Sequence, residues 1–511
     1  MANTLTSETK KNAEAPKQNN NLRWWVLLTV IIGTFLGRLD QTIVNLALPK
    51  MIDDFKITVS AAGWIATAYI LANAVFVPVW GKLGDTIGRK KVYITGFTIF
   101  ILGSVLAGFA WNLGSMIIFR IIQAIASSAD YPTAMAIIAV TFREGKERAQ
   151  ALGIWSSAFA ASAVFGPLLG GPLIDNFGWR SVFLINLPIG LIGVIMALTF
   201  VNESVSEKKT ATFDFWGAIY LGGALSALVL VLDKGIEWGW LSLSSIISYL
   251  CIIIFTFIFI RIEQRHPEPI VDLKFFKNHV FVTTLLDNMV VFMGLIGGIF
   301  LIPLFSQTFL GYGATKTGYL FMPLAFVMMI AAPLGGRLTG KIQPRYILAT
   351  SSAIAAIGIF LFSLFLDPRS TALDVMIPLS IMAFGLGFGM SQRTTIITAA
   401  VPENEVGAAS SILALVRNIA GAFGIAIFAT ILTKATESNV LKLSQQSVIH
   451  SASTAAYQQF IGLITLKAQI SAYQTVFIIS SAIVMLGAIT SFFLIRIHKE
   501  EIVTDAEIFI E

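Results

Sequence analysis

The chain has 511 residues, of which 56% are hydrophobic and only 13% are charged, against roughly 25% charged residues in a typical soluble domain. Its mean hydropathy is +0.79 and its formal net charge is +6. This composition excludes a soluble globular protein. It also means that the basic residues must be placed relative to a bilayer before they can indicate nucleic-acid binding.

Residues 1–22 are polar and lack the apolar core and small-residue cleavage site of a signal peptide, so we expect a cytoplasmic tail. Fourteen mostly apolar stretches follow, each long enough to cross a membrane as a helix. The predicted spans are 24–47, 61–80, 92–111, 114–141, 149–173, 180–201, 214–232, 243–262, 279–305, 315–337, 345–366, 373–399, 406–432 and 471–497. A second cytoplasmic tail, 501–511, ends the chain.

The basic residues predict the orientation of these spans. With the N-terminus in the cytoplasm, most of the 35 Lys and Arg fall in segments predicted to be cytoplasmic, as the positive-inside rule requires. Only Arg38, Arg120, Arg180 and Arg417 are assigned to spans or their edges. We therefore expect a multi-pass protein of the cytoplasmic membrane with both termini in the cytoplasm.

Internal repetition predicts two related halves. Gly336-Arg337-Leu338-Thr339-Gly340-Lys341 follows the tenth span as Gly81-Lys82-Leu83-Gly84-Asp85-Thr86 follows the second. We expect one six-helix bundle in 23–205, two inserted helices in 206–266 and a second bundle in 267–500. The external loop 433–470 mixes apolar and polar residues, which suits either a helix on the outer membrane surface or an ordered cap.

The sequence offers no catalytic or metal-binding constellation. The single cysteine, Cys251, excludes a disulfide within the chain, and no two of the four histidines have the i, i+4 spacing of a helical metal site. No cluster of acids or histidines has catalytic spacing near one membrane face. We therefore expect no metal, no cofactor and no enzymatic activity.

Two acid–arginine pairs are predicted within the membrane. Helical rise places Asp40 and Arg120 at nearly the same depth, where an unpaired charge would cost several kcal/mol. They form either a structural salt bridge or a proton-titrating pair. Asp287 and Arg417 both lie near mid-membrane, so two interpretations are open: Asp287 faces a cavity as a site for a proton or a cationic substrate, or it forms a buried structural pair with Arg417.

Asp130 is a third acid in a predicted span. It lies roughly 24 Å along the fourth span, near the expected cytoplasmic end. Two interpretations remain open: a role in proton or cation handling, or a water-exposed acid in the inner vestibule.

Several motifs carry a family resemblance. Gly81, Gly84, Asp85, Gly88 and Arg89 belong to a loop that resembles the signature loop of the major facilitator superfamily. The segment 39–49 resembles the first-helix motif of fourteen-helix drug:proton antiporters, and Arg120 followed by Gln123 resembles the motif linked to proton coupling. Gly166, Pro167, Gly170 and Gly171 resemble the antiporter motif of the fifth span.

The resemblance covers the chain from Trp24 to Arg496 and implies an all-α polytopic membrane protein with the major facilitator fold. It implies that Asp85 and Arg89 latch the cytoplasmic ends, although a turn that only fixes topology is the alternative. For the motif at Gly166 the resemblance implies export-directed antiport. The alternative, which is compatible with it, is plain packing against the second bundle. The aromatic candidates for a substrate cavity are Trp64, Tyr69, Trp155, Phe159 and Phe305, although most membrane aromatics only pack.

The expected function is proton-coupled export of lipophilic, often cationic, drugs or biocides by alternating access. A dedicated exporter of one endogenous metabolite or lipid-like compound is the alternative on the same fold. The expected partners are a small lipophilic substrate, protons and the lipid bilayer, with no nucleic acid, and the chain is expected to be monomeric. A sensor without transport is disfavoured because Asp85, Arg89 and the Asp40–Arg120 pair are all present.

Overall fold

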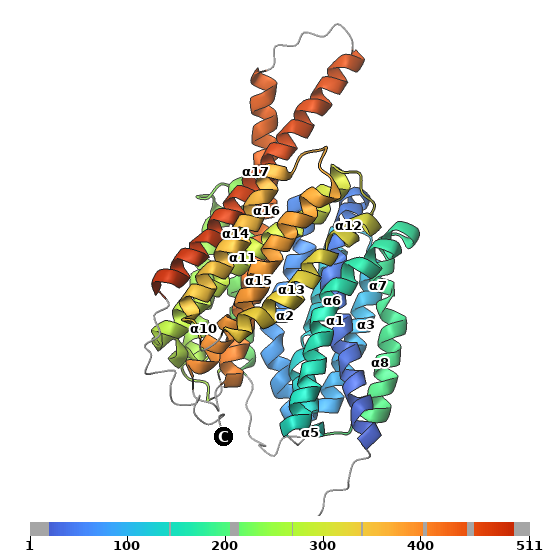
Figure 1. The fold of residues 1–511 in the computed structure, drawn as a ribbon, viewed down its shortest axis with the longest axis vertical. Helices are drawn as coiled ribbons and strands as arrows, with labels where there is room; N and C mark the ends of the chain where they lie inside the picture. The colour runs from blue at the N-terminus through green and yellow to red at the C-terminus, as the bar shows by residue number, and fades with distance from the viewer. Residues whose placement is uncertain are drawn as a thin grey trace, which may run out of the picture.

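The computed structural model describes residues 20–142, 145–204, 214–267, 269–338, 341–401, 406–446 and 454–494, and all regular elements in these ranges are helices (Figure 1). The helices of the first half are α1 (Asn20–Phe55), α2 (Val59–Ile87), α3 (Arg89–Gly108), α4 (Leu113–Ser127), α5 (Asp130–Thr141), α6 (Gly145–Phe177), α7 (Ser181–Leu184) and α8 (Asn186–Phe200). Those that follow are α9 (Phe215–Trp238), α10 (Leu243–Glu263), the 3-10 helix η1 (Leu273–Lys277), α11 (His279–Thr308), α12 (Ala314–Leu320), α13 (Met322–Arg337), α14 (Pro344–Phe365), α15 (Ala372–Ala399), α16 (Val406–Gln446) and α17 (Thr454–Leu494).

Thirteen helical segments in the described ranges are long and apolar enough to cross a membrane. The 33-residue helix α6, which packs along α1, supplies the fourteenth. Helices satisfy their backbone polar groups internally, which lipid requires of any segment that crosses it. The predicted fourteen-helix all-α architecture is therefore confirmed.

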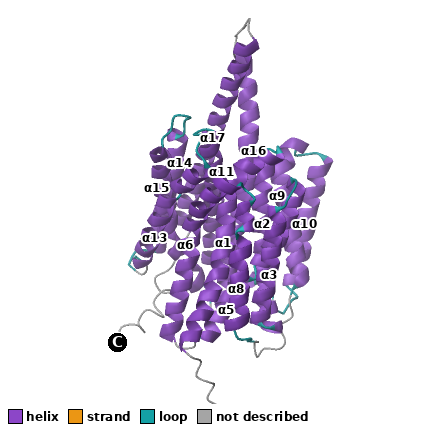
Figure 2. Ribbon diagram, turned by 90° about the vertical axis from the view of Figure 1, so that its right-hand side faces the viewer, coloured by secondary structure: helices purple, strands orange, loops and turns teal. Residues whose placement is uncertain are grey.

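Helices α1–α8 form one bundle and α11–α17 the other, and they meet along two lines of contact. α2 packs against α16, and α6 packs against α12. The inserted pair, α9 and α10, pack on each other, and α9 lies against both α2 and α16, as Figure 2 shows. The inserted pair therefore covers one of the two seams between the halves.

The two ends of the bundle differ. We call the end where α1 begins the tail end, and the opposite end, from which α16 and α17 project, the hairpin end (Figures 1 and 2). α16 and α17 have 41 residues each, so at about 1.5 Å per residue they are roughly twice as long as a bilayer core is thick.

The expectation of a membrane-surface helix in 433–470 is wrong. In the described residues, α16 continues to Gln446 and α17 begins at Thr454, and the two project away from the bundle as a hairpin (Figure 1). The amide of Asn439 donates to the Ala468 carbonyl across it at 3.3 Å. Ile464 and Ala468 are buried. Ile464 and Ala468 therefore pack within the hairpin, whereas Leu441, Ile461 and Leu463 stay exposed.

Candidate functional site

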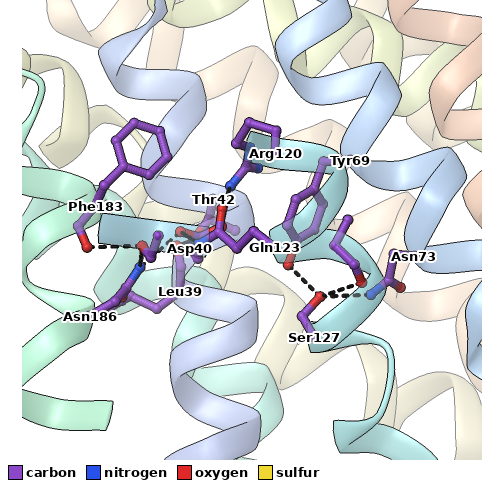
Figure 3. Close-up of polar contacts among 12 residues, drawn as sticks. Leu39, Asp40, Thr42, Tyr69, Asn73, Arg120, Gln123, Ser127, Phe183 and Asn186 are labelled. Carbon is purple, nitrogen blue, oxygen red and sulfur yellow. Dashed lines mark hydrogen bonds and ion pairs between the residues drawn. The ribbon is translucent and has the colours of Figure 1, made fainter. Parts of the chain in front are cut away.

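The first half holds a buried ion pair between α1 and α4. A guanidinium nitrogen of Arg120 lies 2.5 Å from Oδ2 of Asp40, and the two residues are 1% and 0% exposed (Figure 3). The amides of Gln123 and Asn186 each donate to the other oxygen, Oδ1, at 2.9 Å. Both carboxylate oxygens are therefore engaged, and the predicted Asp40–Arg120 pair is confirmed.

Asn186 extends this network to other helices. Its amide donates to the Ser104 hydroxyl at 2.8 Å, and Ser104 donates to the Phe183 carbonyl at 2.9 Å. Asp40 thus ties α1 to α4 and α8, and through Asn186 to α3. Protonation of Asp40 would remove the charge that holds these helices together.

A polar route leads from Arg120 toward the tail end. The Arg120 guanidinium lies over the Tyr69 ring, 3.9 Å from its centroid, and the Tyr69 hydroxyl donates to Ser127 at 2.7 Å (Figure 3). Ser127 and Asp130 line one cavity of about 20 Å³. Because a water needs roughly 10–15 Å³, this cavity is large enough to hold one between Ser127 and Asp130.

Asp130 lies at the depth that the predicted span gave it. It begins α5, beyond the break in the fourth span, and lies about 17 Å from the tail end of that helix by helical rise. Its Oδ1 is buried and has no partner. The Thr34 hydroxyl bonds to its carboxyl group, and the nearby charge of Arg38 also acts on it. Oδ1 of Asp130 is therefore buried between α1 and α5 while the residue as a whole is partly exposed, and its role stays a prediction.

The second half holds an equivalent pair, but with an arginine that the sequence reasoning missed. Arg393 Nε lies 2.8 Å from Oδ2 of Asp287, and both side chains are 0% exposed. Ser491 donates to Oδ1 of Asp287 at 2.6 Å, and Arg393 donates to Ser352 at 2.9 Å. The predicted pairing of Asp287 with Arg417 is wrong because Arg393 occupies that place.

The two pairs use the same helices of each half. Asp40 and Asp287 lie on the first spans, α1 and α11, and their arginines lie on the fourth, α4 and α15. By helical rise, Arg120 lies about 10 Å from the hairpin end of α4, and Arg393 about 9 Å from the tail end of α15. The pairs therefore stand toward opposite ends of the bundle.

The loop at Gly81 is mostly helical. α2 continues through Gly81 and Gly84 to Ile87, and the chain turns at Gly88, whose φ of 110° favours glycine. The side chain of Asp85 lies outside the described part, so its latch with Arg89 stays a prediction.

The sequence reasoning missed Glu203, which anchors this turn. Its carboxylate accepts the backbone N–H groups of Lys90 and Lys91 at 3.0 and 3.2 Å, and Ser204 accepts that of Arg89 at 3.1 Å. A carboxylate is favourable at a helix N-terminus, so Glu203 fixes α3 to the end of α8.

The glycines of α6 permit close helix contacts on two sides. Gly166 and Gly170 face Thr42 and Ile43 of α1, where a Cβ would collide with their side chains. Gly171 faces the backbone of Thr315 in α12, in the other half. The packing interpretation of this motif is therefore confirmed, and the motif lies where the halves meet at the hairpin end.

Asp175, one turn beyond this motif, fastens the same contact. Its two carboxylate oxygens accept the N–H groups of Ala314 and Thr315 at 2.9 and 2.8 Å. Partial burial acts to raise the pKa of Asp175, but the N–H groups of Thr315 and Ala314 outweigh it and lower the pKa below its ordinary value. Gln307 also donates to the Leu46 carbonyl across the halves at 2.9 Å. These contacts close the hairpin end.

We predict that Gly171→Val prevents this closure, because its Cβ would collide with the Thr315 backbone, which cannot move away as a side chain can. Cysteines placed at the hairpin end should become more accessible to a membrane-impermeant maleimide. Gly63→Ala is the matched control, since its Cβ would meet Ala429 of the other half at an ordinary 3.5 Å. Unchanged labelling with Gly171→Val would contradict the prediction.

The predicted aromatic residues occupy different places. Tyr69 lies under Arg120, Trp155 donates to Thr34 at 2.9 Å, and Phe305 packs between Phe309 and Tyr473. Trp64 packs near the buried residues of α16. The side chain of Phe159 lies outside the described part. Whether any of these residues contacts a substrate stays a prediction.

Comparison with known proteins identifies the family. The model of the Major Facilitator Superfamily matches residues 30–425. Multidrug resistance protein Stp of Mycobacterium tuberculosis is 32% identical over 80% of this chain and 76% of its own length. Riboflavin transporter RibZ of Clostridioides difficile is 30% identical over 86% of this chain and 96% of its own.

Solved structures agree on the fold. A bacterial homologue of the human lysosomal transporter Spinster, in an inward-facing and occupied conformation, aligns with a TM-score of 0.70. The alignment covers 95% of this chain and 99% of that one at 17% identity. With the motifs, the fourteen spans and the family match in agreement, the chain belongs to the major facilitator superfamily of membrane transporters, in its fourteen-helix branch.

Proposed function

We propose that this protein is a monomeric proton-driven antiporter that exports lipophilic compounds across the cytoplasmic membrane and needs no cofactor. The observation that carries the proposal is Asp40, a fully buried carboxylate that bonds to Arg120, Gln123 and Asn186. A buried acid that fastens several helices is a two-state element, because adding a proton weakens all of its bonds at once. The relatives named for multidrug resistance support export.

The orientation predicted by the basic residues places the tail end in the cytoplasm and the hairpin end outside. The contacts of Asp175 and Gly171 then lie on the outer side. We assign this arrangement to the inward-facing part of the transport cycle. A cavity of about 480 Å³ lies at the hairpin end next to this contact, and Lys50, Gln307 and Glu437 are among the residues that line it. We assign it as the vestibule through which substrate leaves once the contact opens.

Protonation of Asp40 supplies the conformational step. Once Asp40 is neutral, its ion pair with Arg120 is lost. Arg120 still contacts the Tyr69 ring and donates to Gln123. α1 is then less tightly held to α4 and α8, and α1 packs against α6, which carries the glycine motif and Asp175 at the closed hairpin end. One proton moving inward supplies about 2.3 kcal/mol per 100 mV.

The substrate range keeps two candidates. Export of many drugs or biocides is supported by the relatives with multidrug names. A dedicated exporter of one metabolite is supported by the riboflavin transporter, whose length is almost fully covered. Asp287 was the acidic candidate for a cationic substrate in the second half, and Arg393 neutralises that acid.

The test is gradient-driven efflux of a lipophilic dye from liposomes that contain the purified protein. We predict that Asp40→Asn abolishes proton-driven efflux, at least a hundredfold, while dye binding persists, because an amide cannot exchange a proton. The control is Asp54→Asn, which alters an exposed pair with Arg180 that is worth at most about 1 kcal/mol.

Two results would contradict the proposal. Efflux by Asp40→Asn at the native rate would exclude Asp40 as the coupling acid, and the same assay with Asp130→Asn and Asp287→Asn would then identify another. Native protein that is folded and binds dye, yet moves none under any pH gradient, would exclude proton-driven export itself.

A further inference from the structure

Arg417 differs from the other arginines in the middle of the bundle. Arg120 and Arg393 each pair with a buried aspartate. Among the described residues, Arg417 forms no ion pair. Its guanidinium lies over the Phe292 ring, 4.7 Å from the centroid, and its Nε is buried without a hydrogen-bond partner. The residue as a whole is partly exposed.

The surroundings of Arg417 are positive. Its guanidinium is close enough to those of Arg393 and Arg38 to be repelled by both, and the phenol of Tyr131 is its other electrostatic neighbour. Arg38 and Tyr131 belong to the first half, whereas Arg417 and Arg393 belong to the second. The two halves therefore present arginines toward each other across their interface.

Acids compensate only part of this charge. Asp287 neutralises Arg393, and Asp130 is the acid whose charge acts on Arg38. Arg38 also donates to the neutral amide oxygen of Gln41 at 2.9 Å. These groups together leave one positive charge in excess, and Arg417 carries it. A charge at this depth is costly in a bilayer unless a group of opposite sign meets it.

Unused hydrogen-bond donors lie nearby. Asn288 is fully buried and neither atom of its amide has a partner, and Nη1 of Arg393 has none either. Asn288 and Phe292 are four residues apart, so they share a face of α11, and Arg417 stacks on Phe292. Buried donors without acceptors are unfavourable, and a ligand with acceptor oxygens would satisfy them.

We propose that the transported compounds are lipophilic anions, chiefly carboxylates, and that Arg417 is the residue that binds the anionic group between the two halves. This inference rests on the proposed function as an exporter and gives its substrate class. A guanidinium offers two parallel N–H donors to a carboxylate, and the Phe292 ring provides an apolar surface beside it. This anionic substrate class replaces the cationic substrates expected from the sequence.

The test compares three compounds of one shape with the purified full-length protein in lipid nanodiscs. The probes are naphthalene-2-carboxylate, naphthalene-2-carboxamide and 2-naphthyltrimethylammonium, and the measurement is equilibrium binding of each radiolabelled probe. The carboxylate should bind at least tenfold more tightly than the amide, and the ammonium most weakly. Dodecanoate as a competitor distinguishes the two sources of such anions: displacement by dodecanoate indicates membrane fatty acids, and its absence indicates aromatic compounds.

Substitutions locate the site. Arg417→Gln should weaken carboxylate binding at least tenfold and leave amide binding unchanged, and Arg417→Lys should retain part of the preference because it keeps the charge but not the paired donors. The control is Arg180→Gln, which removes an exposed arginine that pairs with Asp54. Should Arg417→Gln fail to fold, Arg417→Lys and the three-probe comparison on the native protein still decide the matter.

Two outcomes would overturn the proposal: tightest binding of the ammonium probe, or unchanged carboxylate binding by folded Arg417→Gln. Failure of the proposed function has a different signature. If the protein exports cations under a proton gradient, the proposed exporter function stands and the anion assignment is excluded. Tight, Arg417-dependent carboxylate binding without any proton-driven movement would support the anion site and exclude the exporter.

Discussion

Replacing Arg393 by alanine is expected to destabilise the protein by about 3–5 kcal/mol, because Asp287 would be left charged and unpaired in the middle of the second bundle. Both side chains are 0% exposed, so bulk water does not solvate the carboxylate of Asp287. Ser491 would remain the only described donor to the carboxylate, and one hydroxyl cannot compensate a full charge. The measurement is the unfolding free energy in detergent micelles.

A double substitution separates charge from shape in this prediction. Asp287→Asn with Arg393→Gln removes both charges and keeps side chains of similar size, so most of the lost stability should return. Arg345→Gln serves as the control, because Arg345 lies in the first turn of α14 and donates to the exposed Tyr346 hydroxyl at 2.9 Å. A double variant as unstable as Arg393→Ala would mean that packing, and not the unpaired charge, determines the loss.

The fold and one ion pair could be predicted from the sequence because both follow from the helical rise. Spans of about 20 apolar residues determine the number of helices, and counting residues from the span ends placed Asp40 and Arg120 at one depth. Arg393 was missed because it lies near the end of its span and was assigned to the cytoplasmic basic residues. The same depth arithmetic applied to Arg393 would have found it, since Asp287 lies about 12 Å from the tail end of α11 and Arg393 about 9 Å from that of α15.

Other features depend on contacts between distant segments, which no local pattern carries. Asp175 binds the start of α12, 139 residues away, and nothing in its own neighbourhood indicates that partner. Likewise, the apolar residues of 433–470 suit a membrane surface or a helical hairpin equally well. Only the pairing of Asn439 with Ala468 across the hairpin decides between them.

The two buried pairs also bear on how the halves move. Each pair joins the first and fourth spans of its half, and the pairs stand toward opposite ends of the bundle. The Asp40 pair therefore braces the first half toward the end that is closed here, and the Asp287 pair braces the second half toward the other end. A transporter that rocks between two states requires each half to stay rigid while the contacts between halves change. On the proposed mechanism the Asp287 pair keeps the second half rigid, whereas the Asp40 pair is the one that a proton releases.

Export of an anion should depend steeply on membrane potential, which follows from charge counting alone. When one monovalent anion leaves as one proton enters, two charges move in the same electrical direction. At 100 mV this corresponds to about 4.6 kcal/mol, or a change of about a thousandfold or more in the equilibrium concentration ratio of the substrate. A monovalent cation exchanged for one proton moves no net charge, so its distribution would not respond to potential.

The measurement uses liposomes without a pH gradient, in which valinomycin and a potassium gradient set the potential. Naphthalene-2-carboxylate should accumulate on the positive side when the native protein is present, and Asp40→Asn should not support this accumulation. For n protons the charge moved is n + 1 with a monovalent anion and n − 1 with a monovalent cation, so the measured slope also gives the proton number. If the concentration ratio of naphthalene-2-carboxylate does not change with the membrane potential, coupled movement of an anion and a proton is contradicted. No proton number makes n + 1 equal to zero.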